Sequence, residues 1–443
     1  MNPFKNLWLK AVVTLGDKIL DADYLNSLYS WIKYDKLSTE KLDDLERNNL
    51  CKILKHTVET VPYYLKYFNN TKPTCLKDFP ILTKEILREE KENLISNKYK
   101  IDSLVKNYSS GSSGIQSFSY ADRAHKFYTQ GIHSHWYMWT GYKIGDSILQ
   151  FGMSPNRVFP KNLKDLFYNV YYVNSFSLDE QKILKIAENA IHKKVKYIIG
   201  YPSAINQFAS VLIKNNINIP INGIISLGDK LFDHFKNNFN LAFSSPKIID
   251  TYGCAEGILI ACTNDLEYYY IMSPNVTLEI VDNEGNEVPD GALGNVLVTS
   301  HTLFAMPLIR YKLGDLAIKL PKSEYPPNRQ FNYPLLQKIV GRETDVVLTP
   351  DGKTLIVHSF TGIVEFFPEI KQFRIIQEYL DSIIFEYITD NFFKFDESVL
   401  YRIQEKIDSI TEKSIKIIFK KVDYINPTPS GKPQIIESKL IKK

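Results

Sequence analysis

The stretch VKYIIGYPSAINQF, residues 195–208, joins a short apolar run to an amphipathic segment through a tight turn. Residues 195–199 are mostly β-branched and aromatic, so they are predicted to form a buried strand. Glycine, tyrosine and proline at 200–202 supply the turn, and the spacing of Phe208 and Leu212 predicts the helix that follows. A strand that leads through a turn into a helix is the first half of a βαβ unit.

The same alternation of strand and helix extends on both sides of this stretch. Ser177-Leu178-Asp179-Glu180 is a capping box, which predicts that a helix begins there. Residues 223–227 and 247–252 are two more short apolar strands. Such alternation indicates a mostly parallel sheet, whose ligands bind beyond the carboxyl ends of the strands. Glycines stand at three of these ends and predict one crevice there: Gly200, Gly228 and Gly253.

The chain divides into three regions with different sequence patterns. Residues 1–105 are predicted to be mainly helical, with Thr83 as an N-cap, and residues 106–340 carry the α/β pattern. Residues 341–443 have a ββαβ pattern with a boundary near Gly341. We therefore expect an α/β protein with a large N-terminal domain, which starts with a helical segment, and a small C-terminal α+β domain. The expected elements of the small domain are strands at 373–377, 382–387 and 415–419 and a helix around 400–410.

The composition is that of an ordinary globular protein of two or three domains, with 443 residues, 44% hydrophobic and 23% charged. With 54 basic and 50 acidic side chains, the net charge of +4 is too balanced to indicate nucleic-acid binding. The 4 cysteines lack CxxC spacing, so free thiols in a reducing compartment are expected. No signal peptide or membrane-spanning run is recognised in the sequence, so we expect a cytoplasmic protein.

The segment from Trp8 to Leu15 predicts a short amphipathic helix, with Leu9, Val12 and Val13 as its other apolar residues. Packing on the body of the protein is the favoured interpretation. Peripheral contact with a membrane is the alternative.

The run Ser109-Ser110-Gly111-Ser112-Ser113-Gly114 consists only of serines and glycines. Its backbone N–H groups and hydroxyls suit a loop that wraps around an anion. Ile115 and Gln116 follow, so the run is not a Walker loop, which requires a lysine there. A flexible linker is the alternative that the run alone leaves open.

Six motifs in succession resemble the adenylate-forming (ANL) superfamily, specifically its phenylacetate–CoA ligase/CapK-like branch. The six motifs are Ser109–Gly114, Gly200-Tyr201-Pro202-Ser203, Asp250-Thr251-Tyr252-Gly253-Cys254-Ala255-Glu256, Pro307-Leu308-Ile309-Arg310-Tyr311-Lys312-Leu313-Gly314-Asp315, Gly341-Arg342-Glu343-Thr344-Asp345 and Ser430-Gly431-Lys432. The segment Phe79-Pro80-Ile81-Leu82-Thr83-Lys84 is also similar to this branch. The resemblance extends from about residue 60 to residue 438.

The resemblance implies that the chain activates a small carboxylic acid with ATP, forming an acyl-adenylate and releasing pyrophosphate. In this interpretation, Ser109–Gly114 cradles the β- and γ-phosphates. Glu256 is a catalytic residue that holds Mg²⁺, a metal that prefers oxygen ligands. Tyr252, next to Gly253, packs against the adenine.

Three more residues complete the implied site. Asp315 accepts both ribose hydroxyls, and Arg342 adds hydrogen-bond donors there. Lys432, on a mobile C-terminal domain, is the second expected catalytic residue, a compact cation for the carboxylate and α-phosphate oxygens.

Three positions depart from the pattern of the branch. Ala255 stands where many relatives have Thr, and Thr344 stands at the hinge, where relatives commonly have Asp. Asp229 replaces a frequent Glu beside the adenine and stays among the nucleotide-binding candidates. Because hinge positions tolerate several residue types, rotation of the small domain is still expected. Ala255 and Thr344 also motivate an alternative, a nucleotide-binding protein of the same fold that has lost catalysis.

The resemblance leaves the acyl acceptor open between the thiol of CoA and an amine or hydroxyl, such as that of an amino-sugar in polysaccharide biosynthesis. The expected cofactors are ATP and Mg²⁺, with CoA as an option. The oligomeric state is also open, with a homodimer among the possibilities. A non-enzymatic scaffold at the membrane is a further alternative, based on the segment from Trp8 to Leu15.

Two other groups of residues have a functional and a structural interpretation. Cys254 and Cys262, with His301 as a third ligand, would suit a metal, but free buried thiols are favoured. An aromatic segment lines the acyl pocket or, as we favour, packs as a core helix: His133, His135, Trp136, Tyr137 and Trp139.

Overall fold

The computed structural model describes residues 2–69, 71, 73–108, 118–152, 165, 168–175, 178–228, 230–342, 346–351, 354–364, 366–367, 369–389, 395–426 and 435–440. The Ser/Gly run, Ser177, Asp229, Thr344 and Lys432 lie outside these residues. In the described part of the chain, no helix has the length and hydropathy that a membrane crossing requires.

The N-terminal region is helical, as predicted. Its helices are α1 (Leu7–Leu20), α2 (Tyr24–Tyr34), α3 (Thr39–Thr60), α4 (Pro62–Phe68) and α5 (Lys84–Glu90). Thr83 is the N-cap of α5, because its hydroxyl accepts the N–H of Ile86 at 3.4 Å. The expectation that the segment at 8–15 packs on the body holds for Leu9, which is buried, whereas Trp8 and Leu15 face outward.

A mixed sheet of 11 strands forms the centre of the large domain, in the order β10-β11-β12-β13-β9-β8-β7-β6-β5-β3-β4. Its strands are β3 (Ile148–Gly152), β4 (Val170–Asn174), β5 (Tyr197–Gly200), β6 (Gly223–Ser226), β7 (Lys247–Gly253), β8 (Leu259–Thr263), β9 (Tyr269–Ile271), β10 (Val276–Val281), β11 (Leu293–Ser300), β12 (Tyr311–Lys319) and β13 (Leu335–Arg342).

Only one half of this sheet is parallel. Strands β4, β3, β5, β6 and β7 run parallel, and every neighbouring pair from β7 to β10 is antiparallel. The expectation of a mostly parallel sheet is therefore wrong for the second half. The short β7–β8 and β8–β9 connections cannot hold a crossover helix, so they reverse the chain direction.

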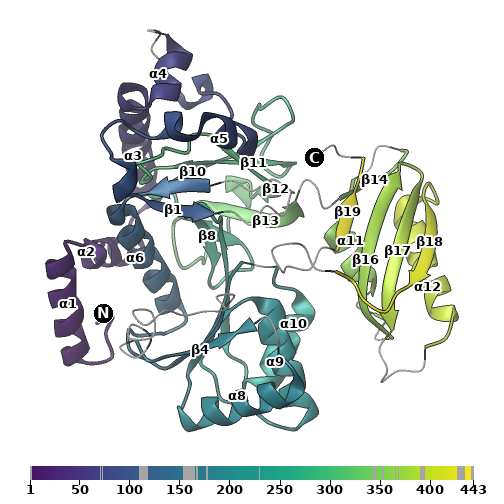
Figure 1. The fold of residues 1–443 in the computed structure, drawn as a ribbon. Helices are drawn as coiled ribbons and strands as arrows, with labels where there is room; N and C mark the ends of the chain where they lie inside the picture. The colour runs from purple at the N-terminus through teal and green to yellow at the C-terminus, as the bar shows by residue number, and fades with distance from the viewer. Residues whose placement is uncertain are drawn as a thin grey trace.

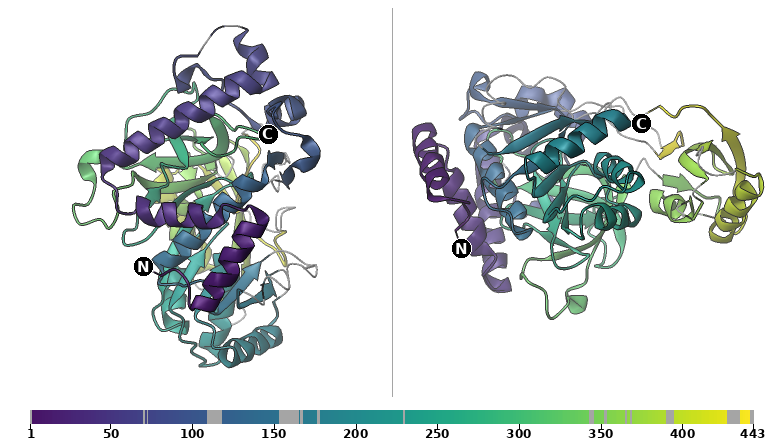
Figure 2. Two further views of the ribbon diagram at one scale, coloured as in Figure 1. Left: turned by 90° about the vertical axis from the view of Figure 1, so that its left-hand side faces the viewer. Right: turned by 90° about the horizontal axis from the view of Figure 1, so that it is seen from below.

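Helices cover both faces of the parallel half (Figures 1 and 2). On one face lie α8 (Glu180–His192), α9 (Pro202–Lys214) and α10 (Asp233–Ala242), and on the other α6 (Arg123–Trp139) and α2. Ile198 and Ile199 of β5 enter these two different cores, which explains why that strand is apolar throughout. The predicted capping box is wrong about the N-cap residue. Asp179, not Ser177, caps α8, and its carboxylate accepts the N–H of Lys182 at 2.8 Å.

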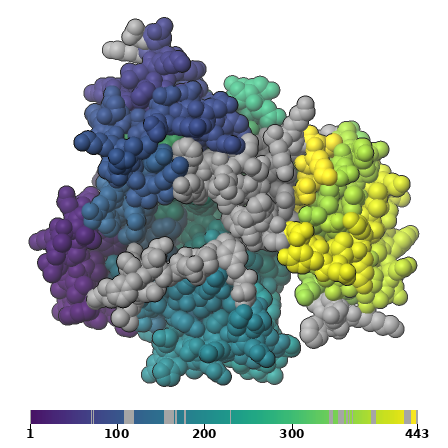
Figure 3. Space-filling view, viewed as in Figure 1, coloured from purple at the N-terminus to yellow at the C-terminus, as the bar shows by residue number. Residues whose placement is uncertain are grey.

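The C-terminal domain confirms the predicted ββαβ unit and adds to it. Its sheet has the order β18-β17-β16-β19. Its elements are β14 (Val346–Leu348), β15 (Thr354–Ile356), α11 (Val357–Val364), β16 (Ile370–Tyr379), β17 (Ser382–Thr389), α12 (Ser398–Thr411), β18 (Lys416–Lys421) and β19 (Ile436–Ser438). Ile403 and Ile407 of α12 pack against Ile375 and Phe385 in a core of its own. The domain lies beside the large one (Figures 1 and 3).

Candidate active site

The turn between β7 and β8 carries Glu256. Two backbone hydrogen bonds close it, from Cys254 N to Ile258 O at 3.0 Å and from Gly257 N to Cys254 O at 3.1 Å. Gly257 has a φ of 93°, a conformation that glycine adopts without strain. The turn therefore fixes the backbone of Glu256, whose side chain is only 3% exposed.

Groups from four elements hold this turn. The Tyr311 hydroxyl, at the start of β12, donates to Glu256 Oε1 at 2.8 Å. The backbone oxygen of Glu256 accepts from Ser119 Oγ at 3.0 Å and from Asn107 Nδ2 at 3.4 Å. His125 of α6 completes the set, with Nε2 3.1 Å from the oxygen of Gly257. Because burial lowers the pKa of His125, its imidazole is neutral at pH 7 and holds the turn as a hydrogen-bonding group.

Asn107 and Ser119 stand on either side of the Ser/Gly run. They belong to β1 (Val105–Tyr108) and β2 (Phe118–Ala121), which pair antiparallel with Tyr108 opposite Phe118. The run itself lies outside the described residues, but both strands that flank it are bonded to the Glu256 backbone. The sequence had linked the run and Glu256 only through the family resemblance.

Tyr252, at the end of β7, and Asp315 of β12 are joined by a hydrogen bond of 2.9 Å from the tyrosine hydroxyl to Oδ2. Burial and the Asp315 charge raise the pKa of Tyr252 well above its usual range, so the hydroxyl stays protonated and donates. Gly314, with a φ of 81°, lies in a β-bulge where β12 departs from its register with β11. Asp315 is the register partner of Arg342 in β13, so these two candidates occupy neighbouring backbone positions.

Two side-chain bonds thus connect the same pair of motifs, Tyr252 to Asp315 and Glu256 to Tyr311. Strands β8, β9 and β13 stand between β7 and β12 in the sheet order. At about 4.8 Å per strand, a flat sheet would separate the two strands by about 19 Å. The sheet must therefore curve to bring these side chains into contact.

Sequence reasoning missed a polar cluster at the carboxyl end of β6, beside the middle of β7. Asp250 accepts from Ser226 Oγ at 2.7 Å and from the hydroxyl of Tyr269. Lys230 follows β6, and its ammonium group lies 3.4 Å from the oxygen of Val340. Burial, then the nearby Lys338 charge, lowers the pKa of Lys230 to about 8. Asp250 belongs to a quoted motif, so its position was the available signal, whereas nothing in the sequence marked Lys230.

The structure bears on the two groups of residues for which the sequence left alternatives. His301 bonds to Thr277 and Pro274, and no group of three metal-ligating side chains occurs among the residues that the structure describes. In α6, Trp136 and His135 are buried, and His135 Nε2 lies 2.9 Å from Asp35 Oδ2. The aromatic segment therefore packs as a core helix.

The comparisons with known proteins agree with this architecture. Residues 347–439 match the family model of the CapK C-terminal domain. Protein CapK from Staphylococcus aureus is 22% identical over 368 residues, which cover 81% of this chain and 79% of CapK. Phenylacetate-coenzyme A ligase from Pseudomonas putida is 32% identical over 105 residues, a segment that covers 23% of each chain.

A solved structure shares the fold of nearly the whole chain. The 2-hydroxyisobutyryl-CoA ligase, crystallised in its postadenylation state with an acyl-AMP, superposes with a TM-score of 0.72 at 14% identity, covering 91% of both chains. At that identity, the likeness is one of fold. The matched C-terminal domain and the similarity to CapK over most of both chains support the adenylate-forming superfamily, CapK-like branch, and the shared fold agrees with it.

Proposed function

We propose that this protein uses ATP to convert a small carboxylic acid into an acyl-adenylate and then transfers the acyl group to an acceptor. The observation that carries the proposal is the double link between Glu256–Tyr311 and Tyr252–Asp315. It gathers a buried carboxylate, an aromatic ring and a second carboxylate from β7, β12 and the turn after β7. The phenylacetate and 2-hydroxyisobutyrate ligases that the chain resembles are both named for joining an acid to CoA.

The reaction needs an arrangement of this kind. A carboxylate oxygen attacks the α-phosphorus of ATP, an acyl O–P bond forms, and the bond to the leaving pyrophosphate breaks. Positioning of the two anions and stabilisation of the charge that develops supply most of the catalysis. In this proposal, Asp315 and Arg342 orient the ribose, Tyr252 and Asp229 face the adenine beside Gly253, and Ser109–Gly114 binds the phosphates that depart.

The described residues fit a magnesium ion bound together with a nucleotide. Mg²⁺ in such sites takes one or two carboxylates, phosphate oxygens and water, and does not need a cage made only of protein ligands. Glu256 offers one buried carboxylate, held by Tyr311. When bound, the metal would offset the negative charge of the phosphates. Glu256 itself would hold it, and the buried turn would keep the carboxylate in place.

The acceptor is proposed as either the thiol of CoA or an amine or hydroxyl of a sugar. In both cases the acceptor attacks the acyl carbon and AMP leaves. The resemblance to phenylacetate–CoA ligases favours the thiol, and the resemblance to CapK favours the sugar, in line with a cytoplasmic role in polysaccharide synthesis. Release of AMP from a preformed acyl-adenylate, measured with CoA and with a panel of amino-sugars, distinguishes the two.

The test of the first step is ATP–pyrophosphate exchange with a panel of small carboxylic acids, with the acyl-adenylate identified by mass spectrometry. At least one acid should support exchange. Lys432→Ala should lower the exchange rate by orders of magnitude with nearly unchanged ATP affinity, because the lysine acts on charge that builds in the transition state. Lys371→Ala, an exposed lysine of β16, is the matched control. ATP binding without exchange for any acid would favour the catalytically inactive alternative.

A further inference from the structure

Helix α1 is fixed to the large domain through one face. Leu9 is 4% exposed and packs in the same core as Phe4. The carboxylate of Asp17 accepts the backbone N–H groups of Tyr24 and Leu25 at 2.9 and 3.3 Å, which ties α1 to the start of α2. The helix is therefore an ordered part of the fold, and the direction of its other face is set.

The opposite face of α1 is apolar and exposed. Leu7, Trp8, Leu15 and Ile19 are 77%, 63%, 61% and 72% exposed. Together with Ala11 they recur at helical spacing along the whole length of α1. We call these five residues the outer strip. Single exposed apolar side chains are ordinary, whereas a contiguous strip marks an interaction surface.

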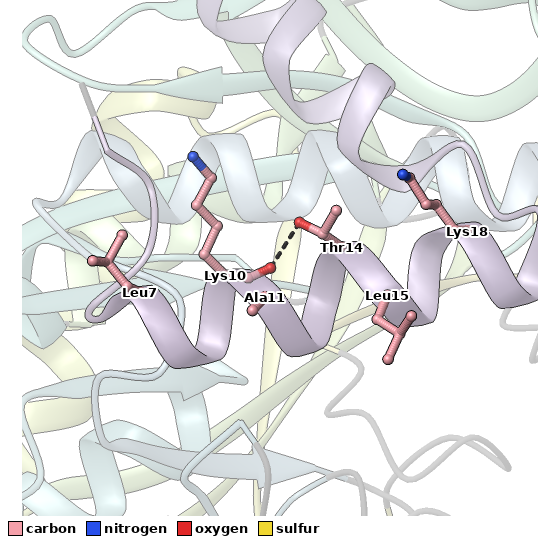
Figure 4. Close-up of a pocket in the computed structure, with 6 residues that line it drawn as sticks. All are labelled: Leu7, Lys10, Ala11, Thr14, Leu15 and Lys18. Atoms are coloured by element: carbon pink, nitrogen blue, oxygen red, sulfur yellow. Dashed lines mark hydrogen bonds between the residues drawn. The ribbon is translucent and has the colours of Figure 1, made fainter.

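Lysines border the outer strip. Figure 4 shows a shallow hollow lined by Leu7, Lys10, Ala11, Thr14, Leu15 and Lys18, in which the two lysine side chains extend to the same side of the helix. Both lysines are exposed. On the same helix, the acidic Asp17 is engaged with α2, and Asp21 lies beyond the last turn. The outward face thus combines an apolar strip with positive charge along one edge.

We propose that the outer strip of α1 docks the protein on an anionic membrane surface. A helix with an apolar face and flanking lysines lies in the plane of the lipid headgroups, where apolar burial and attraction to anionic lipids add together. Trp8 is well placed there, because tryptophan is enriched at membrane–water interfaces.

The lysines also decide against a second copy of the chain as the occupant. In a two-fold contact both copies use the same surface. Two antiparallel α1 helices that cross near Thr14 would place Lys10 of one copy opposite Lys18 of the other. The like charges would repel, whereas an anionic surface pairs with both lysines.

The position of α1 is compatible with docking. The helix lies on the outside of the large domain, on the opposite side of the molecule from the C-terminal domain, in Figure 1 and in the right-hand view of Figure 2. A membrane under α1 would therefore leave the C-terminal domain on the far side. The inference does not depend on the proposed activity and can hold if that activity is absent.

The experiment uses the full-length chain with vesicles of phosphatidylcholine alone or with added phosphatidylglycerol. The protein has 4 tryptophans, and Trp31, Trp136 and Trp139 are at most 8% exposed. A blue shift of tryptophan fluorescence on binding therefore reports on Trp8. We expect this shift, and co-sedimentation, with anionic vesicles and much less with neutral ones. Trp8→Phe should lose the shift and still co-sediment.

Two variants and a control locate the surface. Leu15→Ser/Ile19→Ser should weaken binding to anionic vesicles roughly tenfold or more, because it removes two apolar side chains that docking would bury in the membrane. Lys10→Glu/Lys18→Glu should weaken it and reduce its salt dependence. Leu241→Ser is the matched control, because Leu241 is 66% exposed on α10 and should be replaceable without effect.

Three results would overturn the proposal. One is equal affinity for neutral and anionic vesicles, and another is binding that Leu15→Ser/Ile19→Ser leaves unchanged. The third is a concentration-dependent dimer, seen by sedimentation velocity without lipid, that the same variant abolishes. That result would assign the outer strip to a second copy of the chain.

Discussion

Glu256 shows how one side chain can be tested apart from the fold that holds it. Glu256→Gln keeps an oxygen that can accept from Tyr311, so the turn should survive, while the charge for a metal is lost. We expect ATP–pyrophosphate exchange to fall roughly 10²–10³-fold, the usual cost of removing one electrostatic group from an active site. Exchange rates across a magnesium titration measure the effect.

The control for that variant is Glu267→Gln, which changes an exposed glutamate between β8 and β9. It should exchange like the wild type. Wild-type exchange by Glu256→Gln at all magnesium concentrations would remove Glu256 from the catalytic set. If both variants unfold at the same temperature as the wild type, a difference in exchange rate reflects activity and not stability.

At the scale of residues, the motifs predicted which candidates lie together better than they predicted which other side chains contact them. Tyr252 and Asp315 were candidates from the sequence, and the structure joins them by a hydrogen bond. Tyr311, Asn107 and Ser119 were not, although all three bond to Glu256. Local sequence contains no signal for these contacts, because they bring together residues more than 50 positions apart, and only the folded sheet sets their geometry.

At the scale of elements, a buried ion pair joins Arg310, the residue directly before β12, to Glu279 of β10, and the same arginine also contacts the segment before α5. Arg310 is 6% exposed, and its Nε lies 3.1 and 3.2 Å from the two carboxylate oxygens of Glu279. Its other nitrogens donate to the backbone oxygens of Phe79 and Gly285. Burial raises the pKa of Glu279, and the charge of Arg310 opposes that rise.

Arg310→Met should destabilise the protein by about 3–5 kcal/mol, because it leaves Glu279 buried without its partner. Denaturant unfolding measures the loss. The double variant Arg310→Met/Glu279→Met should recover part of it, since no charge then remains unpaired. A loss under about 1 kcal/mol for Arg310→Met would show that the pair contributes little to stability.

The helices and strands were predicted best, and the errors in their prediction have physical causes. The strand at 195–199 and the helix after it are β5 and α9, because the apolar periodicity and turn residues there agree with the tertiary fold. The cap at Asp179 instead of Ser177 is a choice between two residues that can both cap a helix. The predicted direction of the strands from β8 to β13 was wrong for a different reason. An apolar pattern indicates where a strand lies but not which way it runs.

At the scale of the whole molecule, curvature of the large sheet was beyond prediction. Each strand of the antiparallel half can be located from its pattern, yet the contact of β7 with β12 through Tyr252 and Asp315 depends on the twist of the strands between them. The sequence thus predicted a separate C-terminal domain and named candidate site residues from several strands. Only the fold explains how motifs from different strands converge.

At the contact between α3 and β10, a partly buried carboxyl group is expected to make the stability of the whole molecule depend on pH. Glu46 of α3 accepts from the hydroxyl of Thr277 of β10 at 2.8 Å. Burial raises the pKa of Glu46 from 4.5 to about 7, with Asp43 adding to the rise and Thr277, Lys319 and Lys322 opposing it. The neutral carboxyl is thus favoured in the folded state.

The sign of the effect follows from which state binds the proton more tightly. A raised pKa in the folded protein contributes stability that is complete below about pH 4.5 and is lost as the pH rises through 7. Glu46→Gln keeps an acceptor for Thr277 and carries no charge at any pH. The free energy of unfolding of the variant should match that of the wild type near pH 4.5 and exceed it at pH 8.5 by up to about 3 kcal/mol, the free energy of the pKa shift.

Unfolding in denaturant at a series of pH values measures this free energy for both proteins. Taking the difference between them cancels the titration of His301 and other groups. A difference that stays constant from pH 4.5 to 8.5 would contradict this prediction. It would show that Glu46 has the same pKa in the folded and unfolded chains, so that its burial between α3 and β10 does not favour the neutral carboxyl.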